Sequence, residues 1–138
     1  MQTTELTIHT GAREAIVDLT GQAADFVAGV HDGSRDGLLT VFVPHATAGL
    51  AILELGSGSD SDLLEVLSGL LPLGAHYRHA HGSAGHGRSH VMPAFLAPSV
   101  VVPVVHGRLT LGTWQSLALV DLNVDNPSRV VQLTFLAD

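Results

Sequence analysis

The sequence predicts an α+β fold built on a largely antiparallel sheet or on two packed sheets. Two segments have helical hydrophobic spacing, whereas the second half of the chain is mostly a run of β-rich segments separated by short turns. Parallel strands need crossover connections of a dozen or more residues, and these turns are too short. The chain has 138 residues and neither linker nor internal repeat, so residues 1–138 are expected to form one domain.

The first 30 residues are expected to contain a strand, a short extended segment and a helix. Residues 3–9 alternate polar and apolar side chains, as a half-buried strand does, and residues 14–19 follow a turn at Gly11. Thr20 is the expected N-cap of the helix. The apolar face of this helix has the spacing i, i+3, i+4, i+7 and consists of Ala23, Phe26, Val27 and Val30.

Strands are predicted on both sides of a second helix. Residues 31–37 (HDGSRDG) have the composition of a loop, and the apolar residues 38–43 and 49–55 are typical of strands. After the second helix, the expected strands are Met92–Leu96, Val100–Val105, Arg108–Leu111, Thr113–Asp121 and Arg129–Leu136.

The second helix is expected to start in a Gly/Ser-rich loop, where Ser59 and Asp62 resemble a capping box. Pro72 and Gly74 end it. Residues 75–90 are too polar and too rich in glycine to predict a regular element. The buried face of the helix is expected to consist of Leu63, Leu67, Leu70 and Leu71.

Composition excludes several kinds of chemistry. Acidic residues outnumber basic ones by 13 to 6, for a net charge of −7, and all the basic residues are arginine. Without lysine or cysteine, the chain has no Schiff-base lysine, thiol nucleophile, thiolate metal site or disulfide. A few arginines on an acidic chain argue against a nucleic-acid partner. With no apolar stretch near the roughly 20 residues of a membrane span, and no visible signal peptide, a cytoplasmic protein without a membrane partner is expected.

Histidine is the unusual residue of this chain. There are nine, and five lie in residues 76–90, namely His76, His79, His81, His86 and His90. Neutral imidazole is a common metal ligand, so this segment is a candidate metal site. The alternative is a solvent-exposed loop that is merely rich in histidine. His45 at the end of one predicted strand and Glu54 at the end of the next favour the site, because strand ends present ligands on a rigid scaffold.

Other candidate residues have a structural as well as a functional interpretation. Asp60 and Asp62 suit the positive end of the second helix, and Trp114 suits either a ligand pocket or the core. Phosphate binding and surface solubility are alternatives for Arg78, Arg88 and Arg108. Exposed or structural positions are expected for His9, His31, His76, His81 and His106. The chain has no nucleophile elbow, P-loop or Rossmann glycine motif.

Several segments together resemble the YjbQ family, whose members are also called secondary thiamine-phosphate synthase enzymes. The family's H-T-T/S-A-x-L is similar to residues 45–50 (HATAGL), and its Y-x-H to residues 77–79 (YRH). Residues 85–90 (GHGRSH) resemble G-N-A-x-x-H, and residues 102–115 (VPVVHGRLTLGTWQ) match the closing motif almost letter for letter. The resemblance covers essentially the whole chain.

The resemblance implies a two-sheet sandwich of about seven mainly antiparallel strands with two helices, assembled as a homotrimer. It implies that a divalent metal ion, zinc or magnesium, or an anion is bound by His45, His79 and His90, near a subunit boundary. Catalytic roles are expected for Glu54, Asp62, Trp114 and Gln115. Ligand-binding roles are expected for Thr47, Arg78, His86, Arg88 and Thr113.

Three departures from the family pattern surround this expected site. Leu55 follows Glu54 where the family usually has asparagine, and His86 replaces the asparagine of G-N-A-x-x-H. The family's D-G-P-R ending is altered to residues 123–129 (NVDNPSR), with a short insertion. These changes put an identical substrate preference in question.

The family name implies a reaction that joins hydroxymethylpyrimidine diphosphate to thiazole phosphate and releases pyrophosphate, as a side activity. The thiazole nitrogen is the nucleophile, so no activated serine or cysteine is required. Metal or arginine would stabilise the departing pyrophosphate, and Trp114 would stack on a small phosphorylated heteroaromatic ligand. The alternatives are a metal- or phospho-ligand-binding trimer without turnover and a metal-assisted hydrolase of another substrate.

Overall fold

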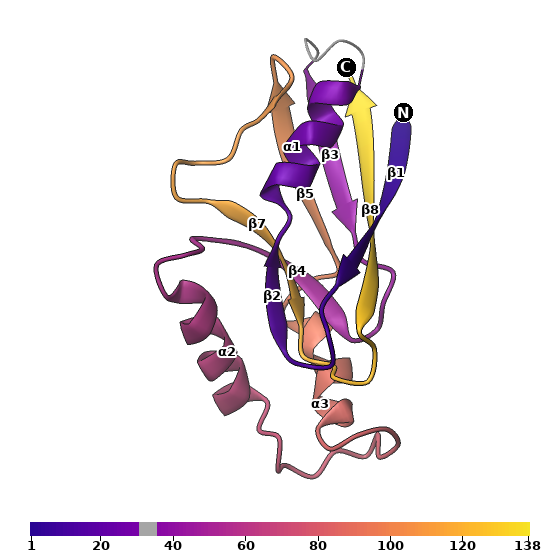
Figure 1. Ribbon diagram of the computed structural model, residues 1–138, viewed down its shortest axis with the longest axis vertical. Coiled ribbons are helices and arrows are strands. Elements are labelled where there is room, and N and C mark those ends of the chain that lie inside the picture. The colour runs from indigo at the N-terminus through magenta and orange to yellow at the C-terminus, as the bar shows by residue number, and fades with distance from the viewer. Residues whose placement is uncertain (31–35) are drawn as a thin grey trace.

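Two antiparallel sheets and three α-helices form the described part of the chain, residues 1–30 and 36–138 of a computed structural model (Figure 1). The larger sheet has the order β1-β8-β3-β5-β6, formed by β1 (Gln2–His9), β8 (Ser128–Ala137), β3 (Gly37–Phe42), β5 (Ser99–Val105) and β6 (Arg108–Leu109). The smaller sheet has the order β2-β7-β4, formed by β2 (Ala15–Asp18), β7 (Ser116–Asp121) and β4 (Ala48–Leu53). This arrangement confirms the predicted α+β class.

Helices flank the smaller sheet and create two apolar cores. Helix α1 (Thr20–Gly29) packs its Ala23 and Val27 into the first core, between the two sheets. The second core lies among the smaller sheet, α2 (Ser59–Leu70) and the short 3-10 helix η2 (Met92–Ala94), which directly follows α3 (His86–Val91). Helices α2 and α3 lie at the end of the molecule opposite both chain termini (Figure 1).

Strand β7 is shared by both cores. Leu117 and Leu119 belong to the first core, whereas Val120 and Leu122, just past the strand end, belong to the second. Strand β8 has the two-residue alternation of a half-buried strand, and Val131 and Leu133 are among its fully buried side chains. Arg129, at the start of β8, occupies one of these inward-facing positions. Because its charged side chain is buried, it needs a partner that forms hydrogen bonds with it and balances its charge.

Both predicted helix starts are wrong in detail. Leu19, not Thr20, is the N-cap residue of α1. The Thr20 hydroxyl instead accepts a hydrogen bond from the N–H of Leu117 at 2.9 Å, which ties α1 to β7. Gly58 precedes α2 with φ +102°, and no side-chain capping bond forms there, so the expected pairing of Ser59 with Asp62 is absent from this helix start.

The segment that follows α2 contains more helix than predicted. Helix α3 begins at His86, inside residues expected to lack regular structure. Residues 92–96, predicted as a strand, include η2 instead, because Pro93 has a fixed φ suited to a helix start and no N–H for a sheet ladder. The loop predicted for residues 31–37 and the interpretation of His31 fall largely on residues 31–35, which lie outside the described ranges.

Two smaller expectations also have an outcome. Leu70, predicted on the buried face of α2, is 51% exposed. None of the helices in the described ranges combines the length and the apolar content that a membrane crossing requires.

Candidate functional site

Arg88 fixes the histidine-rich segment to the body of the protein. It is buried in α3, donates a hydrogen bond from Nη1 to the carbonyl of Leu71 at 3.0 Å, and forms an ion pair with Glu14. Tyr77 adds a second anchor by donating its hydroxyl to the carbonyl of Pro72 at 3.0 Å. Burial lowers the pKa of Arg88. Arg88 was a candidate for ligand binding, but these contacts engage both terminal nitrogens of its guanidinium group within the protein.

Four histidine rings converge where this segment meets α3, and we call His79, His81, His86 and His90 the imidazole cluster. The ring centroid of His79 lies 4.1 Å from those of His81 and His90 and 5.4 Å from that of His86. Ligand nitrogens of His79, His81 and His86 all lie within 4.8 Å of one another. The cluster thus contains two of the histidines expected to bind metal, His79 and His90, together with two others.

The environment favours the neutral form of His79 and of His90. Desolvation lowers the pKa of His79, and the neighbouring rings of His81 and His86 lower it further. Desolvation also lowers the pKa of His90, followed by the effects of the other three rings. A proton on one ring makes protonation of its neighbour less favourable. Neutral imidazole keeps the lone pair that a metal ion requires.

Asp125 orients His86 within the cluster. Its Oδ2 lies 2.6 Å from Nδ1 of His86 and also accepts the N–H of Ser83 at 3.2 Å. Hydrogen bonds from Ser83, and then the contact with His86, lower the pKa of Asp125. An ionised carboxylate accepts hydrogen bonds only, so Nδ1 of His86 carries the proton. Its Nε2 then faces Nε2 of His90, 3.0 Å away.

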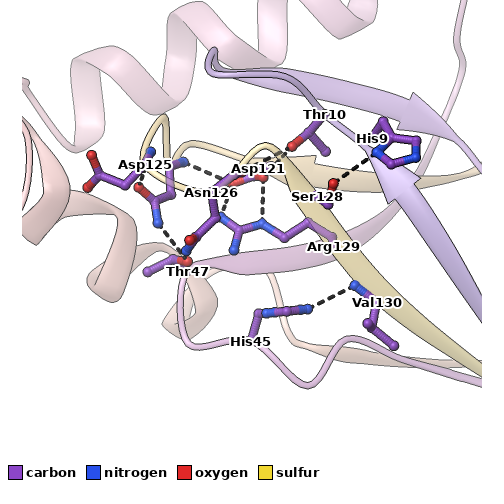
Figure 2. A network of polar contacts seen from close by, with 11 residues as sticks. His9, Thr10, His45, Thr47, Asp121, Asp125, Asn126, Ser128, Arg129 and Val130 are labelled. Atoms are coloured by element: carbon purple, nitrogen blue, oxygen red, sulfur yellow. Dashed lines mark hydrogen bonds and ion pairs between the residues drawn. The ribbon is translucent and has the colours of Figure 1, made fainter.

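His45 lies across a hollow of about 350 Å³ that His81, His86 and His90 also line. Its Nε2 accepts the N–H of Val130 at 2.9 Å (Figure 2). The pKa of His45 is lowered by burial and, next, by the positive charge of Arg129. The neutral ring therefore carries its proton on Nδ1, and in this position His45 is a hydrogen-bond donor.

A buried polar network supports the wall of the hollow (Figure 2). Arg129 donates from Nε and Nη2 to the two carboxylate oxygens of Asp121 at 2.6 and 2.9 Å. Asp121 also accepts the hydroxyl of Thr10 at 3.1 Å and the backbone N–H of Asn123 at 2.9 Å. The side-chain amide of Asn123 reaches the hydroxyl of Thr47 at 3.3 Å, which places Thr47 in this wall.

The remaining predicted site residues lie elsewhere in this chain. Thr47 precedes β4 and Glu54 follows it, so the two are separated by roughly 20 Å of extended strand. Because Leu53 pairs with Ser116, Glu54 lies near the turn that carries Thr113, Trp114 and Gln115. Trp114 is 73% exposed there. Two other predicted residues, Asp62 in α2 and Arg78 before the cluster, are also exposed.

The turn that carries Trp114 is well ordered by its own hydrogen bonds. The side chain of Gln115 accepts the N–H of Gly112 at 2.8 Å, and the N–H of Gln115 returns to the Gly112 carbonyl at 2.9 Å. The exposed tryptophan is therefore held on a fixed turn. Within one chain, the histidines and Trp114 occupy opposite ends of the smaller sheet.

Sequence reasoning missed three residues that organise the histidine end. The sequence predicts a solvent-facing His81, and the residue is exposed, but its ring also joins the imidazole cluster, for which its spacing of two residues from His79 is a signal. Arg129 falls on a position of β8 where the two-residue alternation predicts a buried apolar side chain. A charged residue at such a position is a signal of a buried charge that the sequence alone provides. Asp125 lies 39 residues from His86, and no local pattern signals that contact.

Thermal stability is expected to fall as the pH is lowered from 7.5 to 5.5. The pKa values of His45, His79 and His90 are lowered in the folded protein, so near pH 6 the unfolded chain takes up protons that the folded chain does not. The loss of stability begins at about pH 6.5, the usual pKa of histidine, and ends once the pH is below the pKa values of these histidines in the folded protein. Melting curves at several pH values measure it, and a midpoint that is constant or rises on acidification would contradict it.

Comparison with known proteins identifies the relatives of this chain. A family profile described as "UPF0047 protein YjbQ-like" matches residues 4–138. The UPF0047 protein Rv2556c of Mycobacterium tuberculosis is 58% identical over 136 residues, which cover 99% of this chain and 98% of that protein. A UPF0047 protein of Archaeoglobus fulgidus is 38% identical over 127 residues, covering 92% of this chain and 96% of the relative.

Solved structures agree with the fold described above. The hypothetical protein APE1520 of Aeropyrum pernix aligns with a TM-score of 0.88 and 34% identity, covering 100% of both chains. A YbjQ-like protein of unknown function from Sulfolobus solfataricus aligns with a TM-score of 0.90 and 26% identity, covering 99% of this chain and 97% of the other. The names of these proteins state no reaction.

Proposed function

This chain belongs to the YjbQ-like UPF0047 family, and on that premise we propose that its histidine end is a divalent-metal site with thiamine-phosphate synthase side activity. The observation that carries the proposal is that three rings of the imidazole cluster line the same hollow as His45, while the ring of His79 packs against two of them, those of His81 and His90. Imidazole nitrogens around a polar hollow are suited to holding a divalent metal ion, which would polarise a phosphorylated ligand.

The donor set favours zinc over magnesium. Magnesium prefers oxygen ligands, whereas imidazole nitrogen suits zinc and other first-row transition metals. His79 and His90 would hold the ion, and His45 would join them only by releasing the N–H of Val130. When bound, the metal supplies Lewis-acid stabilisation of the negative charge that grows on departing pyrophosphate.

The protein's own groups would bind and orient the two substrates. The thiazole nitrogen attacks the methylene carbon of hydroxymethylpyrimidine diphosphate, a carbon–nitrogen bond forms, and the carbon–oxygen bond to pyrophosphate breaks. No side chain has to remove a proton in this step. Arg78, exposed beside His79, and the hydroxyl of Thr47 are the groups we assign to the phosphates, because Arg88 is committed to Glu14 and to the Leu71 carbonyl.

Assembly as a homotrimer would complete this site. Glu54, Trp114 and Gln115 lie too far from the cluster to act on the same ligand within one chain. A neighbouring subunit would bring its own Trp114 turn to the hollow, where the indole would stack on the heteroaromatic ring. We place the trimer in the cytoplasm, in keeping with the composition of the sequence.

Binding without turnover is the second candidate, favoured by the distance between the histidines and Trp114 within one chain. A metal-assisted hydrolase of another phosphorylated substrate would use the same groups. Both alternatives share the metal site and differ in the product formed.

We expect purified, tag-free protein to form thiamine phosphate from the two substrates when zinc is added, and the His79→Ala variant to lose at least about 100-fold of this rate. His76→Ala is the matched control, because His76 lies in the same segment outside the cluster. Light scattering and circular dichroism check the oligomeric state and folding of each variant. Full activity in His79→Ala would refute the site, and zinc binding without product in the wild type would favour the second candidate.

A further inference from the structure

Two departures from the family pattern, far apart in the sequence, meet in the structure. His86 stands where the family usually has asparagine, and Asp125 lies in the altered segment 123–129. The two residues are 39 positions apart, yet Nδ1 of His86 and Oδ2 of Asp125 are separated by only 2.6 Å. The contact therefore depends on both of these residues.

Asp125 is held in place from the protein core. Its backbone N–H donates to Oδ1 of Asn123 at 3.0 Å, and the N–H of Asn123 donates to Asp121, the partner of Arg129. From the other side, the N–H of Ser83 donates to the same carboxylate oxygen that faces His86. The carboxylate is thus fixed in the position that receives the Nδ1 proton of His86.

Gly82 permits this close approach. It has a φ of +84°, which favours glycine, and a Cβ there would lie 2.7 Å from Nδ1 of His86 and 2.9 Å from Oδ2 of Asp125. A side chain at position 82 would separate the pair. The tight turn therefore places backbone, carboxylate and imidazole together as one unit.

The result is that His86 presents an unprotonated Nε2 to the other rings. A carboxylate behind an imidazole fixes its tautomer and strengthens it as a metal ligand. Nitrogens bound to one zinc ion at about 2.0–2.1 Å lie roughly 3.0–3.4 Å apart. In the metal-free protein Nε2 of His90 donates to the unprotonated Nε2 of His86 at 3.0 Å. Ligand nitrogens of His79, His81 and His86 lie within 4.8 Å of one another, so a modest approach of the rings would bring all three onto one ion.

We propose that His79, His81 and His86 form a zinc-class metal site, with His86 as a ligand through Nε2 and Asp125 as its positioning residue. This inference deepens the proposed function, with which it shares His79. It adds ligands beyond the set of His45, His79 and His90 that the family resemblance implies. It also explains why a histidine and an aspartate occur together at these positions.

The test is zinc affinity of the tag-free protein at pH 7.5, measured by competition with a chromophoric chelator. We expect His86→Asn to weaken binding at least about 10-fold, and Asp125→Ala to weaken it about 10- to 100-fold, as loss of a carboxylate behind a ligand does. Asp36→Ala is the matched control, because Asp36 lies beside His106, 3.7 Å away, on the exposed surface. If His86→Asn does not fold, Asp125→Ala decides alone, since Asp125 is exposed.

A second measurement needs no metal. Nitrogen-15 NMR of the metal-free protein should show His86 with its proton on Nδ1, and Asp125→Ala should shift this tautomer. Wild-type zinc affinity in both variants, or an unchanged tautomer, would overturn the inference. Zinc binding through His86 without any thiamine phosphate would support the inference and refute the proposed function. Full synthase activity in His86→Asn with undiminished zinc affinity would support the proposed function and refute this inference.

Discussion

Replacement of Arg129 by methionine is expected to lower the free energy of unfolding by about 3–5 kcal/mol. The substitution removes the guanidinium and leaves Asp121, which is completely buried, as an uncompensated charge at the end of the first core. Thr10 and the N–H of Asn123 would still donate to the carboxylate, but two short charge-assisted bonds would be lost. The loss of stability comes mainly from leaving the buried carboxylate of Asp121 without an opposite charge.

Urea denaturation followed by circular dichroism measures this effect. The double variant Arg129→Met, Asp121→Leu removes both charges and should recover a large part of the loss. Glu5→Gln is the surface control, since Glu5 is exposed and contacts only the amide of Gln132 among the polar contacts described for it; its effect should stay below about 1 kcal/mol. A loss below 1 kcal/mol for Arg129→Met would show that the pair does not support the fold.

Alanine at position 49 is expected to destabilise the protein by about 3 kcal/mol, the upper end for an overpacked core. Gly49 lies in β4, where a Cβ would collide with the carbonyl oxygen of Leu96. The neighbouring Leu50 donates its N–H to the Ala97 carbonyl at 2.9 Å, so the two backbones cannot separate without losing a hydrogen bond. The strain therefore falls on backbone that is fixed from both sides.

The same substitution elsewhere gives a matched control of opposite sign. Gly69 lies within α2, and a Cβ there would meet no atom within 4 Å. Gly69→Ala should stabilise the protein by about 0.5–1 kcal/mol, because alanine favours helix over glycine. Thermal melts of the two variants should move in opposite directions, and a shared direction would contradict the packing described for Gly49.

The fold was largely predictable because its strands carry strong alternation. Residues 3–9 and 129–136 follow the period of two that the larger sheet uses, and their ends are right to within about two residues. Helix α3 was not predictable from local sequence. Its glycines and histidines are poor helix formers, and its formation depends on the buried Arg88 and its contacts with Leu71 and Glu14.

The candidate site was predictable only where the signal is local. The histidine excess, and the resemblance that singled out His79 and His90, came from short motifs. The contact of His86 with Asp125 joins distant segments, and the distance of Trp114 from the histidines follows from the direction of β4 relative to β7. The spacing of motifs along the sequence does not show that the histidines and Trp114 lie at opposite ends of these paired strands.

The position of β7 between two cores has a consequence for how the protein opens. Its side chains contribute to one core through Leu119 and to the other through Val120, and both of its edges are paired, with β2 and with β4. Neither core can come apart while this strand stays in place with its contacts intact. The backbone amides of β7 should therefore exchange with solvent only through the global opening of the molecule, so the histidine end and the terminal end unfold as one cooperative unit.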